Sequence, residues 1–237
     1  MSLGTDEIVR VVDDAGSAVV AGEVSVELAR VLARAARVNH LVEERPDLSF
    51  SSTLIALVGG ADDTSHWLRT YLSSTDVDIP ELLRTRSIAD EAELETILEP
   101  AVEPIELAEP LVASRSAVRL LRAARRLSEE ASNGAALDVR HLIGAYIYDG
   151  ADHEADFDHL QFNRPDWSVA FVTFVGRWRP TEATTWSDQH RRKFPKTPLG
   201  VVDNVGPSTH ITSDLWTTTD SLGYSAYAFA IAKFIRH

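Results

Sequence analysis

Apolar residues recur at helical spacing in two long stretches of the chain, and each stretch opens on a serine. The first stretch runs from Ser25 to Val38, and the second runs from Ser114 to Leu127. Apolar positions at i, i+3, i+4 and i+7 indicate one buried helix face. Serine is a favoured N-cap because its side-chain oxygen accepts a hydrogen bond from a first-turn N–H. Most arginines of the two stretches fall on the opposite face, where their charged heads remain in water. Both stretches are therefore predicted to be amphipathic helices.

The two predicted helices are related by an offset of 89 residues, the difference between positions 114 and 25. The same offset, without a gap, places Leu48 on Leu137 and Leu54 on Ile143. Two successive elements in one register indicate a single large duplication, because a solenoid would repeat at a much shorter period.

Each repeat is predicted to contain four helices. Those of the first repeat begin near positions 25, 48, 64 and 79, and those of the second near positions 114, 138, 160 and 167. Gly59 and Gly60 end the second helix of the first repeat. The segment 169–175 has high β-propensity, but the register of the repeats favours a helix there.

The pattern predicts an all-α fold built from two tandem four-helix repeats with pseudo-twofold symmetry. Residues 1–21 form an N-terminal extension, interpreted as a short helix or a hairpin with a turn at 14–16. The double repeat covers residues 22–178, as 22–99 and 111–178, with a proline-containing linker between them. Residues 179–237 are interpreted as an irregular linker arm followed by an apolar terminal helix, which indicates a piece of a longer protein.

Composition narrows the classes of function. The chain has no cysteine, which excludes thiol nucleophiles and thiolate metal sites and fits a cytoplasmic protein. Its net charge of −13 disfavours nucleic-acid binding, because a polyanion would be repelled. Residues 191–193 with Lys196 are the one basic patch that the sequence nominates, and they are interpreted as solvated linker. No apolar run approaches the roughly 20 residues that span a bilayer.

The densest group of metal-ligating side chains lies at 152–159. On a helix His153 and Asp156 would share a face, but His159 would not join them, so a zinc-helix arrangement is not assembled. A solvated polar turn is the favoured interpretation, and a metal-dependent hydrolase using these three residues is kept as an alternative. The chain has no nucleophile-elbow motif, so neither a catalytic residue nor a cofactor is predicted.

Histidine and tryptophan residues are interpreted mainly as core. His141 is predicted to be a hydrogen-bonded core histidine. The same core interpretation is given to Trp67, Trp167 and Trp178. Trp186 lies in polar sequence, where it is either an exposed interaction anchor or part of an arm that folds back onto the domain.

Two features of the double repeat are shared with a known family. The serines at 25 and 114 cap the first helices, and Arg140-His141-Leu142 opens the second helix of the second repeat before a break at Gly150. In these features the segment from about 22 to 178 resembles the N-terminal domain of Clp (Hsp100) unfoldases. The first repeat, at 49–57, matches more loosely. The resemblance implies a double four-helix module that binds peptides, degradation tags or adaptor proteins.

In some members of this family, the capping hydroxyl of helix one and a glutamate of helix two bind phosphorylated arginine. The hydroxyl positions correspond to Ser25 and Ser114, but the glutamate positions correspond to Ser51 and Arg140. A guanidinium needs carboxylates for a bidentate pair, so this ligand is not expected here. The expected site is instead a groove near these four residues, with Arg140 favouring an acidic side chain or a C-terminal carboxylate.

The terminal stretch 220–237 resembles the segment that precedes the phosphate-binding loop of KAP-type P-loop NTPases, although no such loop occurs in the chain. The resemblances together imply a non-catalytic recognition or regulatory module at the N-terminus of a larger, ATP-dependent protein. Its expected partners are a protein or peptide ligand and its own missing C-terminal domain, with neither nucleic acid nor membrane. A self-assembly module of that protein is the alternative.

Overall fold

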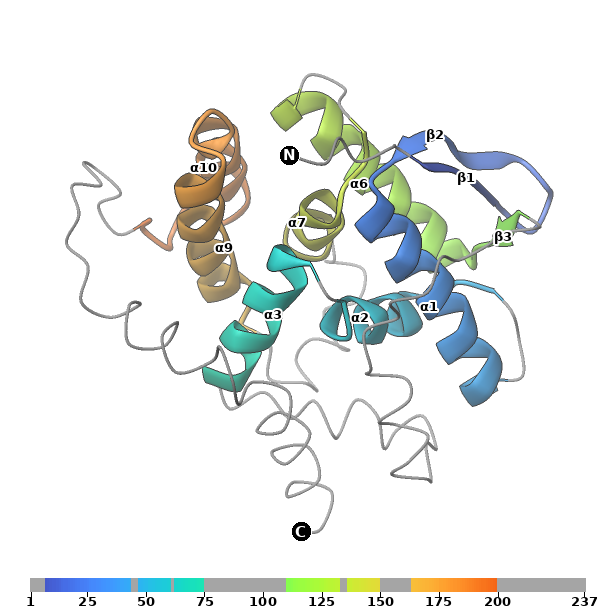
Figure 1. The fold of residues 1–237 in the computed structure, drawn as a ribbon. Coiled ribbons are helices and arrows are strands. Elements are labelled where there is room, and N and C mark those ends of the chain that lie inside the picture. The colour runs from blue at the N-terminus through green and yellow to red at the C-terminus, as the bar shows by residue number, and fades with distance from the viewer. Residues whose placement is uncertain are drawn as a thin grey trace, which may run out of the picture.

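The computed structural model describes residues 7–43, 47–60, 62–74, 110–132, 136–149 and 163–199 of the 237-residue chain. Most of the described residues lie in helices, and the strands form one small sheet (Figure 1). The prediction of a mostly helical protein is confirmed, with the sheet as an addition. Outside the described residues lie the predicted fourth helix of the first repeat, the third helix of the second, most of the linker between them and the terminal helix.

The N-terminal extension is a β-hairpin, one of the two structures predicted for it. Strand β1 (Glu7–Val12) pairs antiparallel with β2 (Ala18–Val24). In the turn, the side chain of Asp13 accepts the backbone N–H groups of Ala15 and Ser17 at 3.0 and 2.8 Å. Gly16 has a φ of 78°, a left-handed conformation that glycine adopts without steric cost.

A third strand completes the sheet from far along the chain. Strand β3 (Leu111–Val112) pairs parallel with the end of β1, so the strand order is β2-β1-β3. Val11 and Val20 are buried in the core, so the face of the hairpin that carries them packs against the helices.

The two serine-capped helices form as predicted. Helix α1 (Val26–Glu43) is capped by Ser25, whose Oγ accepts the N–H of Leu28 at 3.2 Å. Helix α6 (Arg115–Ser132) is capped by Ser114, whose Oγ accepts the N–H of Ala117 at 3.4 Å. Their predicted apolar faces are buried in the core.

Two shorter helices lie inside the molecule. Helix α2 (Phe50–Val58) starts with a reciprocal capping box between Ser49 and Ser52. It ends at Gly59, where the sequence predicts its end. Helix α7 (Val139–Asp149) is buried along almost its whole length and lies centrally in Figure 1. A helix that is apolar on all sides is stable only when other elements surround it. The hydroxyl of Tyr146 in α7 donates to the carbonyl of Phe50 in α2 at 2.5 Å and ties the two together.

Two backbone bridges connect the starts of these four helices in a reciprocal way. Isolated parallel bridges join Val24 to Leu137 and Leu48 to Ala113. Beside the first bridge, the backbone N–H of Ser25 donates to the carbonyl of Leu137 at 2.8 Å. Beside the second bridge, the backbone N–H of Ser114 donates to the carbonyl of Leu48, also at 2.8 Å. An offset of 89 residues converts one set of partners into the other. The start of each long helix is thus bonded to the residue that precedes the more distant short helix.

The remaining core is aromatic. Trp67 of helix α3 (Asp63–Ser74) stacks on Phe174 of helix α9 (Arg164–Trp178), with ring centroids 5.0 Å apart. Residues 169–175 are helical, so the register of the repeats predicted them correctly. The core interpretation of Trp178 is wrong, because this side chain ends α9 and is 59% exposed.

The interpretation of residues 183–193 as part of an irregular linker arm is also wrong. They form helix α10 (Ala183–Lys193), which packs beside α9 and against α6 and α7 (Figure 1). Trp186 and His190 of this helix are fully buried. Of the two interpretations of Trp186, the fold-back onto the domain is therefore confirmed. None of the helices within the described ranges is long and apolar enough to cross a membrane.

Candidate functional site

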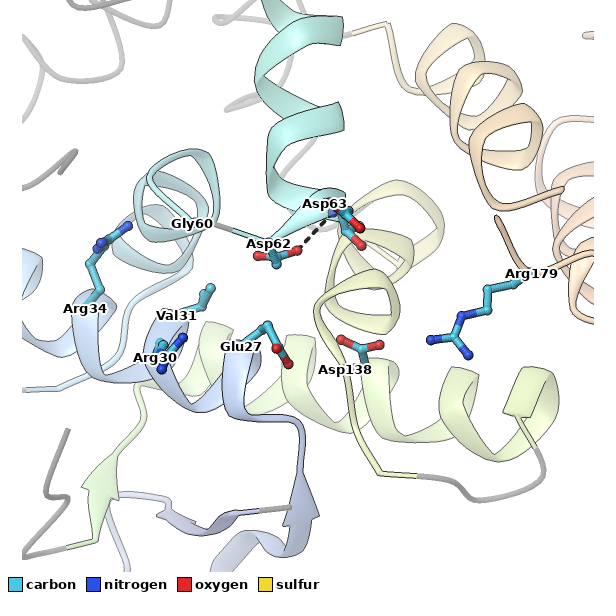
Figure 2. Close-up of a pocket in the computed structure, with 10 residues that line it drawn as sticks. Glu27, Arg30, Val31, Arg34, Gly60, Asp62, Asp63, Asp138 and Arg179 are labelled. Atoms are coloured by element: carbon cyan, nitrogen blue, oxygen red, sulfur yellow. Dashed lines mark hydrogen bonds between the residues drawn. The ribbon is translucent and has the colours of Figure 1, made fainter. Parts of the chain in front are cut away.

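A pocket of about 400 Å³ opens where the N-terminal ends of α1, α3 and α7 approach the C-terminal end of α2 (Figure 2). Its lining is strongly charged and contains both signs. The lining residues are Glu27, Arg30, Val31, Arg34, Gly60, Asp62, Asp63, Thr64, Asp138 and Arg179.

Two of the acidic residues are committed to capping helices. One carboxylate oxygen of Asp62 accepts the backbone N–H groups of Thr64 and Ser65, both at 3.0 Å, at the start of α3. Asp138 accepts the N–H of Val139 at 2.6 Å at the start of α7. Carboxylates are favoured at these positions because they satisfy unpaired N–H groups and face the positive end of the helix dipole.

Arg34, one of the arginines of the pocket, binds the C-terminal end of a helix. The guanidinium of Arg34 is buried and donates to the carbonyl of Gly59, while Arg69 donates to the carbonyl of Val58 at 2.8 Å. Both carbonyls belong to the C-terminal end of α2, where a positive charge is stabilising. Arg34 therefore forms part of the pocket wall as a structural group.

Four charged side chains of the pocket remain uncommitted. Within the described part of the chain, no hydrogen bond or ion pair is formed by the side chains of Glu27, Arg30, Asp63 or Arg179. In the view of Figure 2, the carboxylates of Glu27 and Asp138 lie between Arg30 and Arg179. The pocket thus offers the carboxylate of Glu27 and the guanidinium groups of Arg30 and Arg179 to a ligand.

Arg140, the basic residue of the predicted site, is paired inside the protein. Its Nε and Nη2 donate to the two carboxylate oxygens of Glu182 at 3.0 and 3.1 Å, a bidentate arrangement. Its Nη1 pairs with Asp138, and the side chain is only 10% exposed. Glu182 thus occupies the place that the sequence assigned to a ligand carboxylate, and Arg140 supports the pocket from behind Asp138.

The structure separates the four predicted site residues into two pairs. Ser25 donates to the carboxylate of Asp138 at 3.1 Å, so Ser25 and Arg140 meet at this aspartate beside the pocket. Ser114 bonds to Leu48 at the start of α2, the helix whose first turn contains Ser51. Ser25 follows β2 and Ser114 lies just after β3, and these two strands lie on opposite sides of β1.

Sequence reasoning missed the four uncommitted charges. Glu27 and Arg30 stand three residues apart on α1, but Asp63 begins α3 and Arg179 is the C-cap of α9, and no spacing in the sequence connects these three places. Only the predicted helix caps could have indicated that several N-termini carry acidic side chains.

His141 lies next to this site as a neutral, hydrogen-bonded core residue, which confirms the sequence prediction. Its Nδ1 accepts the backbone N–H of Asp138 at 3.1 Å, so the proton of the neutral ring is on Nε2, 3.0 Å from the Ser132 hydroxyl. Burial, and next the positive charge of Arg140, lowers the pKa of His141 to about 3.

We expect this histidine to make the protein less stable in mild acid. The unfolded chain takes up the proton near pH 6.5 and the folded chain only near pH 3. The stability contribution is therefore fully present above pH 6.5 and falls below it by about 1.4 kcal/mol per pH unit. Urea unfolding of wild type and His141→Gln between pH 7 and pH 5 tests this, since every other histidine is present in both proteins. Equal pH slopes for the two proteins would contradict the prediction.

The structure does not test the metal alternative. Within the described ranges, no group of three or more His, Asp or Glu side chains could hold a metal ion. The cluster at 152–159, with His153, Asp156 and His159, lies outside those ranges.

The basic patch at 191–193 belongs to the exposed end of α10. Arg192 and Lys193 pair with Glu130 and Asp149, both at 3.3 Å. Exposed pairs of this kind contribute little to stability.

Comparison with known proteins does not assign the chain to a family. No protein-family model matches it, and neither a curated protein nor a solved structure is significantly similar to it.

Proposed function

We propose that the chain is a non-catalytic recognition module whose pocket binds a charged segment of a protein or peptide. The observation that carries this proposal is the set of uncommitted charges, Glu27, Arg30, Asp63 and Arg179, around an opening of about 400 Å³. A pocket of this size suits a few side chains of a ligand. Charge-assisted hydrogen bonds would supply both affinity and orientation.

The proposal includes the duplicated, Clp-like architecture. It is supported by the two reciprocal bridges, Val24–Leu137 and Leu48–Ala113, whose partners differ by the same 89 residues as the two capping serines. A duplicated helical cradle with charged helix ends fits a role in holding a ligand. In the same proposal, the module belongs to a larger ATP-dependent protein and presents ligands to it.

The ligand is expected to carry both signs of charge. A carboxylate of the ligand would pair with Arg30 or Arg179, and a basic side chain would pair with Glu27 or Asp63. Arg140 and Ser25 act indirectly, because both bond to Asp138 and hold it at the pocket wall.

A charge reversal in the pocket tests the proposal. The variant Arg30→Glu/Arg179→Glu should lower binding to an array of short immobilised peptides by about tenfold or more, the loss expected for one or two charge-assisted contacts. The matched control is Arg37→Glu/Arg191→Glu, which reverses two charges at exposed positions that do not line the pocket. Circular dichroism checks that both variants are folded. An unchanged pattern of bound peptides in the pocket variant would overturn the proposal.

A further inference from the structure

A second charged surface lies on α6, away from the residues that line the pocket. Arg115, Arg119, Arg122 and Arg126 are all exposed, and they follow one another at spacings of four, three and four residues. This spacing places them in one stripe along the helix. At 1.5 Å per residue the stripe is about 16 Å long. We call these four residues the arginine stripe.

The local surroundings leave the stripe positively charged. Between Arg115 and Arg126 the helix has no acidic residue, and Glu129 and Glu130 are the first to follow. Arg126 pairs with Asp149, but its side chain is 58% exposed, so this pair holds it weakly. Arg115 and Arg122 have no hydrogen bond or ion pair with any residue in the described ranges.

The corresponding helix α1 does not have this stripe. An offset of 89 residues places Arg115 on Val26 and Arg122 on Ala33, and Ala33 is buried. An amphipathic helix needs a polar outer face but not four aligned arginines, so the role of the helix in the core does not account for them.

We propose that the arginine stripe is a docking surface for a short acidic segment of a partner protein. Carboxylates match guanidinium groups in charge and in bidentate geometry. A stripe of about 16 Å corresponds to about five residues of an extended peptide.

A nucleic acid fits this surface less well. Its phosphates continue in both directions, and at the end of the stripe they would meet Glu129, Glu130 and Asp149. The net charge of −13 would also repel a long polyanion, whereas a short acidic peptide can remain on the stripe.

Fluorescence anisotropy with a labelled oligoglutamate peptide tests the proposal on the full chain. Wild type should bind the peptide with an affinity that falls as salt is added. The variant Arg115→Glu/Arg122→Glu should bind at least about tenfold more weakly, as expected for the loss of two charge-assisted contacts. The control Arg37→Glu/Arg191→Glu makes the same change in net charge at exposed positions outside the stripe and should bind like wild type.

Three results would overturn the proposal. One is equal binding by the stripe variant and the control variant. Another is tighter binding of an oligothymidylate of the same charge, which would indicate a nucleic-acid surface. The third is a change in oligomeric state of the stripe variant in light scattering, which would indicate that a second copy of the chain covers the stripe. Arg115 and Arg122 do not line the pocket, so the stripe variant should keep the wild-type binding of peptides that carry both signs of charge, which separates this test from that of the proposed function.

Discussion

Replacement of Trp186 by alanine is expected to lower the free energy of unfolding by about 3–5 kcal/mol, the usual cost of removing a large buried aromatic side chain. Trp186 is fully buried, and its ring meets that of Phe171 edge-on, with centroids 5.1 Å apart. Its indole N–H donates to the Glu182 carboxylate at 3.3 Å. The ring also covers Gly144, where a Cβ would lie only 2.5 Å from it, so position 144 has no side chain that could move into the cavity left by alanine.

Trp178 provides a control of the same residue type. It is 59% exposed, so Trp178→Ala should change the unfolding free energy by less than about 0.5 kcal/mol. Urea unfolding followed by circular dichroism measures both variants, and Trp186→Phe provides a milder change if the alanine variant does not fold. Similar small losses for the two alanine variants would contradict the placement of α10 in the core.

The sequence predicted those parts of the fold that depend on local patterns. Helices α1 and α6 combine an apolar stripe with a serine cap, and α2 ends at a glycine pair, so neighbouring residues contain the whole signal. The hairpin turn was visible for the same reason, because Asp13 and Gly16 satisfy the turn by themselves.

The sequence could not reveal helix α10 because its burial depends on distant partners. Its eleven residues include one large apolar side chain, Trp186. The other buried side chains, Gln189 and His190, are polar, and they are satisfied by residues on other elements, such as Glu130 and Ser168. A helix that buries polar side chains shows no apolar stripe. Strand β3 is invisible for a similar reason, since two residues become a strand only by pairing with β1.

The candidate site shows the same limit. The sequence led to the expectation that Arg140 would pair with a carboxylate of a ligand, but in the structure its guanidinium pairs with a carboxylate of the protein itself. It could not indicate that the carboxylate belongs to Glu182, which is 42 positions further along the chain. The pocket itself requires the ends of α1, α2, α3 and α7 to meet, and this meeting is decided by packing.

Arg140→Met is expected to lower the free energy of unfolding by about 3–5 kcal/mol, as is usual when one partner of a buried ion pair is removed. The side chains of Arg140 and Glu182 are only 10% and 8% exposed, so methionine would leave Glu182 as a buried carboxylate without its cation. Asp138, at the pocket wall, would lose the same partner. The exposed pair of Arg126 with Asp149 is the control, and Arg126→Met should cost less than about 1 kcal/mol.

A double-mutant cycle with Glu182→Gln separates the loss of the ion pair from the loss of packing. If most of the cost comes from a stranded carboxylate, the double variant Arg140→Met/Glu182→Gln should be clearly more stable than the sum of the single losses implies, by about 1–3 kcal/mol. Urea unfolding of the four proteins gives this coupling energy. Additive losses would mean that the carboxylate is hydrated in the Arg140→Met variant. In that case the ion pair with Glu182 would not hold Arg140 in place. Arg140 could then not hold the carboxylate of Asp138 at the pocket wall through that ion pair.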